Sequence, residues 1–293
     1  MKNLKLAAVC LSCLTMTGCS ALNFSVEGLI NAPKLTSEQS EIHQALIESV
    51  GSNITLKYPK NGEYRSAYVI ANIDDEPTDE AMVFYEYTSN GSEEDGLRVN
   101  ILDKDEDGKW YSVKELAGAG TDIDQVIISP MGSNNQTDVF VGYQNLTNDE
   151  KTMEIYSYTD GDFKRVALDT YSVLEPLDIN NDGYIELITI QRSTNNDTGA
   201  VTAKASMLNM KNNEITRGEN VDMCDNVTSY VSSKTGMLDS GRRAIFIDGL
   251  TADGKLQTEI IYYRYSGLQN PMQLRSEKLL PLCTRPAGYY SED

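Results

Sequence analysis

Histidine is almost missing from this chain, which has only His43 among its 293 residues. Catalysis of the Ser-His-Asp and Cys-His kinds needs a histidine beside the nucleophile, and histidine-rich zinc sites need several. No glycine-rich phosphate loop is present either. Since His43 falls on a predicted helix outside the β-rich body, we expect it to be an exposed helix residue. A hydrolase built on two carboxylates needs no histidine, so that class of enzyme stays open.

Positive charge is scarce as well. The chain has 25 Lys and Arg against 44 Asp and Glu, a formal net charge of −19. Loss of residues 1–18, which hold two lysines and no acids, would leave −21. Because nucleic acids and anionic lipids repel so acidic a chain, we expect no nucleic-acid partner. Solubility at a cell surface is our main explanation for the charge.

No apolar run is long enough to span about 30 Å of hydrocarbon. The run at 6–16 follows two lysines and precedes small residues, a pattern that predicts a signal peptide over 1–18. Met16–Cys19 resembles the lipobox of bacterial lipoproteins, with Met16 in place of the usual leucine. In that family the cysteine carries diacylglycerol and becomes the mature N-terminus. The resemblance implies lipid attachment at Cys19 and a lipid-anchored protein on the extracytoplasmic face of the cell membrane.

Cysteine is too rare to build a disulfide scaffold. Cys10 and Cys13 would leave with the signal peptide, so Cys224 and Cys283 are the two that remain beyond Cys19. They could form one disulfide in an oxidising compartment, and their pairing is left open.

One helix is predicted between a tether and the rest of the chain. Residues 19–35 are rich in Ser, Asn, Gly and Pro and indicate a loose tether. In the segment 36–51, Thr36 and Gln39 have the spacing of a capping box, and Gly51 is suited to end a helix. The apolar residues of one helical face are Ile42, Ala45, Leu46 and Val50.

The body of the chain is a repeat. From residue 52 onward, short segments rich in Val, Ile, Tyr and Thr alternate with Gly, Asn and Asp turns, which is typical of all-β proteins. The pattern Asp-Gly-x-aromatic-x-x-Val occurs at 107–113 and again at 160–166, 53 residues later. Such a segment predicts a hairpin, because Asp-Gly accepts the positive φ of a primed turn. The strands before the hairpins align at 98–102, 153–157, 204–208 and 259–263.

About four strands in about 50 residues is the period of a β-propeller blade, whose two faces are both buried. We therefore expect an all-β protein with a β-propeller domain over 52–293. The predicted blades are 64–117, 118–170, 171–224 and 225–275, with a partial fifth over 276–293. Two interpretations of this end stay open: a larger propeller that is truncated here, or a small one closed by Asn53–Tyr58 pairing with the C-terminal strand.

The segment 178–186 has the composition of a Ca²⁺ loop. Oxygen-bearing side chains occupy positions 1, 3, 5 and 9, and Gly183 allows a sharp turn at position 6. Calcium takes six to eight oxygen ligands, including backbone carbonyls. The predicted ligands of one structural Ca²⁺ are the side chains of Asp178, Asn180, Asp182 and Glu186 and the carbonyl of Tyr184.

This loop, flanked by strands, resembles that of the integrin-α-like FG-GAP or VCBS repeat. There an Asp-x-Asn-x-Asp-Gly-x-x-Glu loop joins the first two strands of a blade and binds Ca²⁺. The corresponding stretches of the other units, at 74–80, 130–138 and 235–241, lack the glycine or the acids and are expected to have lost the metal. The segment 103–108 also fits Asp-x-Asp-x-Asp-Gly, but we expect a solvated turn because no acid follows at position 9.

The function favoured by these features is a non-catalytic binding or recognition module at the cell surface, attached to the membrane through lipid on Cys19. Its ligand is an unknown protein or glycan, and its 17 tyrosines suit a recognition surface. The alternative is a structural scaffold of a cell-envelope complex, and a carboxylate-based glycan hydrolase is less favoured. Fixed envelope partners would indicate a scaffold, whereas a glycan or host protein would indicate recognition.

Overall fold

The computed structural model describes residues 35–88, 96–130, 137–145, 150–194, 197–199, 201–211, 214–225, 227–265 and 267–270. The chain divides into two compact units, Met1–Ser40 and Glu41–Asp293. The predicted signal peptide, Cys19, nearly all of the tether, Cys283 and the partial blade 276–293 lie outside the described residues.

In the first unit the predicted capping box is confirmed. It opens helix α2 (Ser37–Val50), which continues into the second unit. Thr36 N donates to Gln39 Oε1 at 3.1 Å, and Gln39 N donates to Thr36 Oγ1 at 3.1 Å. Two amides at the start of the helix are thus satisfied reciprocally. No helix in the described part of the chain is both long and apolar enough to cross a membrane.

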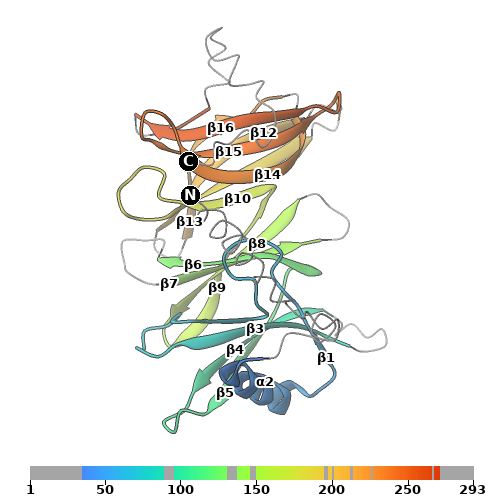
Figure 1. The fold of residues 1–293 in the computed structure, drawn as a ribbon, viewed down its shortest axis with the longest axis vertical. Helices are drawn as coiled ribbons and strands as arrows, with labels where there is room; N and C mark the ends of the chain where they lie inside the picture. Colours follow the sequence, from blue (N-terminus) through green and yellow to red (C-terminus); the bar gives the residue numbers. More distant parts are fainter. Residues whose placement is uncertain are drawn as a thin grey trace, which may run out of the picture. The chain divides into compact units, whose positions relative to one another are not determined.

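The second unit contains four antiparallel sheets that follow one another in chain order (Figure 1). Sheet A contains β1 (Ile54–Leu56), β2 (Tyr68–Ala71), β3 (Glu80–Tyr87), β4 (Leu97–Lys104) and β5 (Trp110–Ala117). Sheet B contains β6 (Asp122–Pro130), β7 (Thr137–Gln144), β8 (Lys151–Thr159) and β9 (Asp162–Tyr171). Sheet C contains β10 (Val173–Leu177), β11 (Glu186–Thr194), β12 (Val201–Lys211) and β13 (Glu214–Asp222). Sheet D contains β14 (Val227–Met237), β15 (Arg243–Thr251), β16 (Leu256–Arg264) and β17 (Gly267–Gln269).

These sheets confirm the all-β class and the repetition of antiparallel units, of which sheet A has five strands and the other three have four. Each sheet is formed by strands that are consecutive in the chain, and every pairing between strands is antiparallel among the described residues. Such sheets are consistent with propeller blades, whereas a closed propeller remains a proposal.

The long apolar runs of the second strands arise because alternate residues face different cores. In β3, Met82 and Phe84 pack in a core shared by sheets A and B, whereas Val83 and Tyr85 face α2. Strand β7 follows the same rule: Val139 and Val141 join the A–B core, and Phe140 joins the B–C core. A strand buried on both faces needs apolar residues at consecutive positions, as the sequence pattern predicted.

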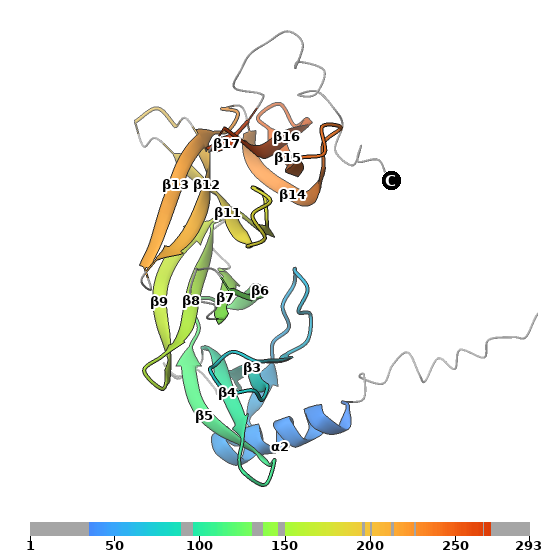
Figure 2. The ribbon, with the colours of Figure 1, turned by 90° about the vertical axis from the view of Figure 1, so that its left-hand side faces the viewer.

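Sheet A is covered on its outer face by α2, which lies beside it in Figure 2. Ile42 and Leu46 are fully buried there. The expectation that His43 is exposed was wrong. His43 is half-buried, and its Nδ1 lies 2.8 Å from the hydroxyl of Tyr68 on β2. His43 follows the buried Ile42 along the helix, so its imidazole lies close enough to the sheet to contact Tyr68.

The first strand of sheet A also departs from expectation. Strand β1 was one candidate to close the domain by pairing with the C-terminal strand. Instead it pairs with β3, with Ile54 opposite Tyr87 and Leu56 opposite Tyr85. Strand β2 pairs with the other end of β3, Tyr68 opposite Val83. The two short strands therefore share one edge of β3, which leaves the segment between them to run across toward sheet B.

The two repeated hairpins differ in their turns. Asp160 and Gly161 have φ values of 55° and 73°, as a primed turn requires. In the other hairpin only Gly108 has a positive φ, of 76°, so the primed turn predicted there was wrong. Asp105 causes the difference, because its Oδ1 accepts the backbone amides of Asp107 at 3.0 Å and Lys109 at 2.9 Å. The expected solvated turn at 103–108 is thus a loop that its own aspartate closes.

We expect Gly142→Ala to lower the free energy of unfolding by about 1–3 kcal/mol, as overpacking does in a filled core. A Cβ at Gly142, on β7, would overlap the hydroxyl of Tyr171 and lie 3.2 Å from its Cζ. Tyr171 is fully buried, and its hydroxyl bonds to Asp124 at 2.7 Å, so it has no room to withdraw. Urea denaturation measures the loss. Gly96→Ala is the control, since its nearest atom belongs to the flexible Arg98 side chain; equal losses would contradict the prediction.

Candidate metal centre

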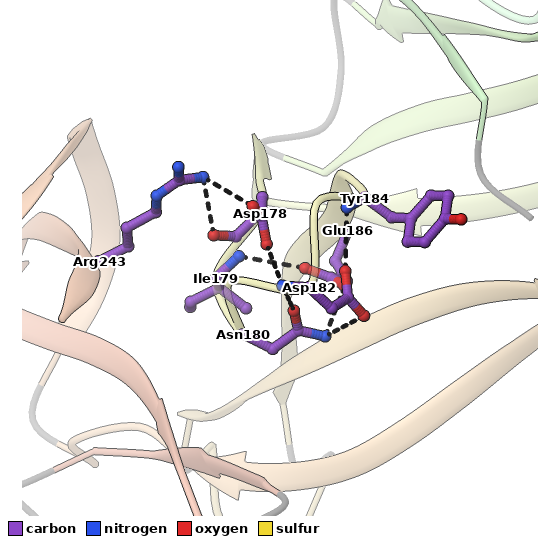
Figure 3. Close-up of polar contacts among 7 residues, drawn as sticks. All are labelled: Asp178, Ile179, Asn180, Asp182, Tyr184, Glu186 and Arg243. Atoms are coloured by element: carbon purple, nitrogen blue, oxygen red, sulfur yellow. Dashed lines mark hydrogen bonds and ion pairs between the residues drawn. The ribbon is translucent and has the colours of Figure 1, made fainter.

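The predicted metal loop joins the first two strands of sheet C. It leaves β10 at Leu177 and enters β11 at Glu186. Two residues in it have positive φ values, Asn181 at 61° and Gly183 at 95°. A left-handed asparagine followed closely by a left-handed glycine reverses the chain within a few residues. The turn brings side chains from both ends of the loop toward its middle, as Figure 3 shows.

Three of the predicted ligands meet around the backbone of Asp182. Its amide lies 3.1 Å from Asp178 Oδ1 and 2.8 Å from Asn180 Oδ1. Its own Oδ1 accepts the amide of Tyr184 at 2.9 Å. Oxygens at positions 1, 3 and 5 are therefore directed into the loop, as a loop that encloses an ion requires. The Tyr184 side chain is 52% exposed, and the role predicted for its carbonyl stays a prediction.

Glu186 closes the loop from its far end. Its side chain is buried; Oε2 accepts the amide of Ile179 at 3.1 Å and Oε1 accepts Asn180 Nδ2 at 2.8 Å. Burial raises the pKa of Glu186 to about 7, and the carboxylates of Asp182 and Asp178 add to the rise. The raised pKa thus reflects first the burial of the carboxyl and second the two neighbouring carboxylates.

A cationic side chain that sequence reasoning did not identify, Arg243, reaches the loop. Arg243 begins β15 of sheet D, and its Nη1 lies 3.1 Å from the carbonyl of Asp178 and 3.1 Å from Asp178 Oδ2. The contact joins two different sheets, so the two residues lie 65 positions apart in the chain and no short sequence motif contains both. Because Arg243 shares the Asp178 carboxylate, an ion bound here would compete with it for that oxygen.

The donor set of the loop fits a hard cation. Nine residues supply three carboxylates and an amide oxygen, and Gly183 faces open space. The amide nitrogen of Asn180 also donates to Asp182 Oδ2 at 2.9 Å, so it lies between the carboxylates of Asp182 and Glu186. In this arrangement no three Asp, Glu, His or Cys side chains of the described residues form a ready-made metal site. Ion binding would thus require the Asn180 amide nitrogen to move out from between these two carboxylates.

The equivalent loop of sheet A is closed by hydrogen bonds. Ile73 N donates to Glu80 Oε2 at 2.8 Å, just as Ile179 N donates to Glu186, seven residues ahead in both loops. The matching loop therefore begins at Asn72, two residues before the start that the sequence indicated. Asn72 Nδ2 donates to the carbonyls of Glu76 and Thr78. An amide donor thus satisfies the oxygens that a cation would need.

The other two sheets differ more. In sheet B the stretch after Pro130 lies largely outside the described residues. In sheet D the loop between β14 and β15 is short, with Gly241 N donating to Leu238 O at 2.7 Å. Arg243 occupies the first position of β15, where sheet C has Glu186 at the start of β11. A cationic side chain at that position is incompatible with a Ca²⁺ ligand, in keeping with the predicted loss of the metal in this unit.

We expect the free energy of unfolding to fall by about 2 kcal/mol between pH 5 and pH 8 through Glu80 alone. Glu80 is 3% exposed, and its Oε1 has no hydrogen-bond partner among the described residues. Burial raises its pKa to about 7, with Asp74 and Asp103 adding to the rise. The folded state thus favours the neutral acid. The stability that this provides is complete below the pKa of the unfolded chain and is lost as the pH rises through the folded pKa of about 7.

Glu80→Gln tests this dependence, because the amide stays neutral at every pH. In urea titrations with EDTA, the variant should show a smaller difference between pH 5 and pH 8 than the wild type. Glu106→Gln removes the same charge from an exposed hairpin and should leave the difference unchanged. An unaltered difference in Glu80→Gln would contradict the assignment.

No protein-family model and no curated protein matches the chain. A candidate 6-phosphogluconolactonase from Bacteroides fragilis NCTC 9343 is similar at 10% identity and a TM-score of 0.34, over 76% of this chain and 67% of that one. AofleA from Arthrobotrys oligospora has 11% identity and a TM-score of 0.32, and 53% of it is covered by 65% of this chain. A candidate exo-β-1,3-galactanase from Bifidobacterium bifidum s17 has 11% identity and a TM-score of 0.27, over 71% of each chain. Similarities this weak carry no argument about fold or function.

Proposed function

We propose that the chain is a lipid-anchored, non-catalytic binding module whose β-propeller, of the FG-GAP or VCBS type, is stabilised by one Ca²⁺. The observation that carries the proposal is the loop 178–186. Its oxygen-bearing side chains turn inward between the first and second strands of sheet C, the connection that carries the ligands in that repeat. Lipid on Cys19 would hold the module on the extracytoplasmic face of the cell membrane.

The role proposed for Ca²⁺ is structural. Asp178, Asn180, Asp182 and Glu186 would hold it with their side chains, and Tyr184 with its carbonyl. When bound, the ion supplies positive charge that neutralises the three carboxylates. The connection between β10 and β11 has few buried side chains of its own, apart from Ile179 and Glu186. Neutralisation would therefore stabilise the loop without a catalytic step.

Recognition is favoured over catalysis by the place of the one histidine. His43 bonds to Tyr68 beneath α2, at the outer face of sheet A. Crosslinking on intact cells, combined with an array of glycans, tests the proposal. Capture of a discrete protein or glycan supports it. Hydrolysis of an array glycan, or no partner in either assay, would overturn it.

We expect Cys19→Ser to release the protein from the membrane into the extracytoplasmic medium. The chain is strongly acidic, so no basic patch would hold it on an anionic lipid surface once the acyl chains are lost. Fractionation and intact-mass analysis measure the change. Cys13→Ser is the matched control, because that residue would be removed with the signal peptide. Membrane retention of the Cys19 variant would reveal a second attachment.

A further inference from the structure

A polar cavity of about 360 Å³ lies where the first strands of sheets B, C and D approach one another. Strands β6, β10 and β14 each contribute to its wall, together with the segment between β1 and β2. The volume is at the lower end of the range for small-molecule sites. Its lining residues that matter below are Asn61, Asp124, Gln125, Lys151, Ser172 and Glu175.

One side of the cavity is held by an ion pair between a buried aspartate and a half-buried lysine. Asp124 is 2% exposed, and its Oδ1 lies 2.8 Å from Lys151 Nζ and 2.8 Å from Asn61 Nδ2. Its Oδ2 accepts the hydroxyl of Tyr171 at 2.7 Å. These bonds fix the Lys151 ammonium at the wall while using one of its three protons. The lysine thus remains a donor that is placed before any ligand arrives.

The opposite side offers acceptor and hydroxyl groups. Glu175 is half-buried, and its Oε1 accepts the hydroxyl of Ser233 on β14. Burial raises the pKa of the Glu175 carboxyl, while Lys151 lowers it. Ser172 Oγ is buried and has no hydrogen-bond partner among the described residues. A buried hydroxyl without a partner costs free energy unless a ligand or water supplies one.

We propose that this cavity binds a neutral, hydroxyl-rich ligand of the size of one or two sugar residues, such as the end of a glycan. Vicinal hydroxyl groups both donate and accept, so they match a carboxylate, an ammonium and a serine hydroxyl that line one small space. Asp124 and Glu175 disfavour an anionic ligand, and Lys151 disfavours a cationic one. The inference rests on the proposed function and assigns its ligand class and its place.

The experiment uses the full mature chain with Ca²⁺ present. Glucose, galactose, mannose, fucose, N-acetylglucosamine and N-acetylgalactosamine are screened by saturation-transfer NMR, and an array extends the screen to neutral, sialylated and amine-bearing glycans. Glu175→Gln keeps the shape of the side chain and removes its charge, and Ser172→Ala removes the hydroxyl. Glu106→Gln, in the exposed β4–β5 hairpin, is the matched control for charge.

The expected result is binding of at least one neutral saccharide, a loss of about tenfold or more in affinity for Glu175→Gln, and no loss for the control. A saccharide that binds Glu175→Gln and Ser172→Ala as tightly as the wild type would overturn the placement. Binding of charged glycans alone, or of no saccharide, would overturn the ligand class. If the cavity binds no neutral saccharide but a protein partner is captured on cells, the proposed binding function still holds. If no partner of either kind is found, the binding function and the saccharide site are both overturned.

Discussion

Lys151→Met should lower the free energy of unfolding by about 3–5 kcal/mol, the range observed when one partner of a buried ion pair is removed. The Asp124 side chain, at 2% exposure, would have only the donors Asn61 and Tyr171 left. Methionine preserves most of the length of lysine, so the loss reports the missing charge more than a cavity. Urea denaturation of the mature domain measures it.

Two comparisons separate the charge from other effects of the substitution. Lys255→Met removes a lysine whose side chain is 79% exposed and should lower the free energy of unfolding far less than Lys151→Met. In the double variant Asp124→Asn with Lys151→Met, no charge remains buried, so the loss should be well below that of Lys151→Met alone. Equal costs at Lys151 and Lys255 would show that the Asp124 pair contributes little.

The repeated sheets could be predicted because their causes are local. A strand that faces two cores must be apolar at consecutive positions, and β3 shows this in its sequence. The helix could be predicted for the same reason, because its capping residues Thr36 and Gln39 are only three positions apart in the chain. Patterns of this kind are set by neighbours in the chain, which a single sequence displays directly.

The features that could not be predicted depend on contacts between distant segments. Arg243 reaches Asp178 from 65 residues away, and Lys151 meets Asp124 across sheet B. Neither Lys151 nor Arg243 stands out in the sequence, because isolated charged residues occur throughout it. The pairing of β1 with β3 was missed for the same reason: a three-residue strand has too little pattern to select its partner.

The loop of sheet A shows how a starting point that is wrong by only two residues misleads an alignment. Counting acids from Asp74 gave a segment without the glycine of the metal loop, which was expected to have lost the metal. The hydrogen bond from Ile73 to Glu80 gives the register instead, because it repeats the bond from Ile179 to Glu186. The isoleucine at the second position of each loop and the glutamate at its end would have been the better sequence signal.

Calcium should stabilise the wild-type domain by about 2.7 kcal/mol when its concentration is 100 times the dissociation constant. Asp182→Ala should abolish this gain, because the substitution removes one of the three carboxylates of the loop, whereas the backbone amide that donates to Asp178 and Asn180 is kept. Unfolding with and without Ca²⁺ measures the gain, and calorimetric titration measures one bound ion per chain. Asp107→Ala, in the look-alike hairpin of sheet A, should bind Ca²⁺ as the wild type does.

The comparison in EDTA makes the test specific to the ion. Without Ca²⁺, Asp182→Ala loses only the bonds that the exposed carboxylate receives from Asn180 Nδ2 and the Tyr184 amide, which we expect to cost about 1 kcal/mol. If the free energies of unfolding of the wild type and Asp182→Ala differ more in Ca²⁺ than in EDTA, the additional difference must come from the bound ion. If the wild type gains no stability from Ca²⁺, or Asp182→Ala still releases the full heat of binding, the loop is a hydrogen-bonded turn. Its three carboxylates would in that case be balanced by Asn180 and Arg243 alone.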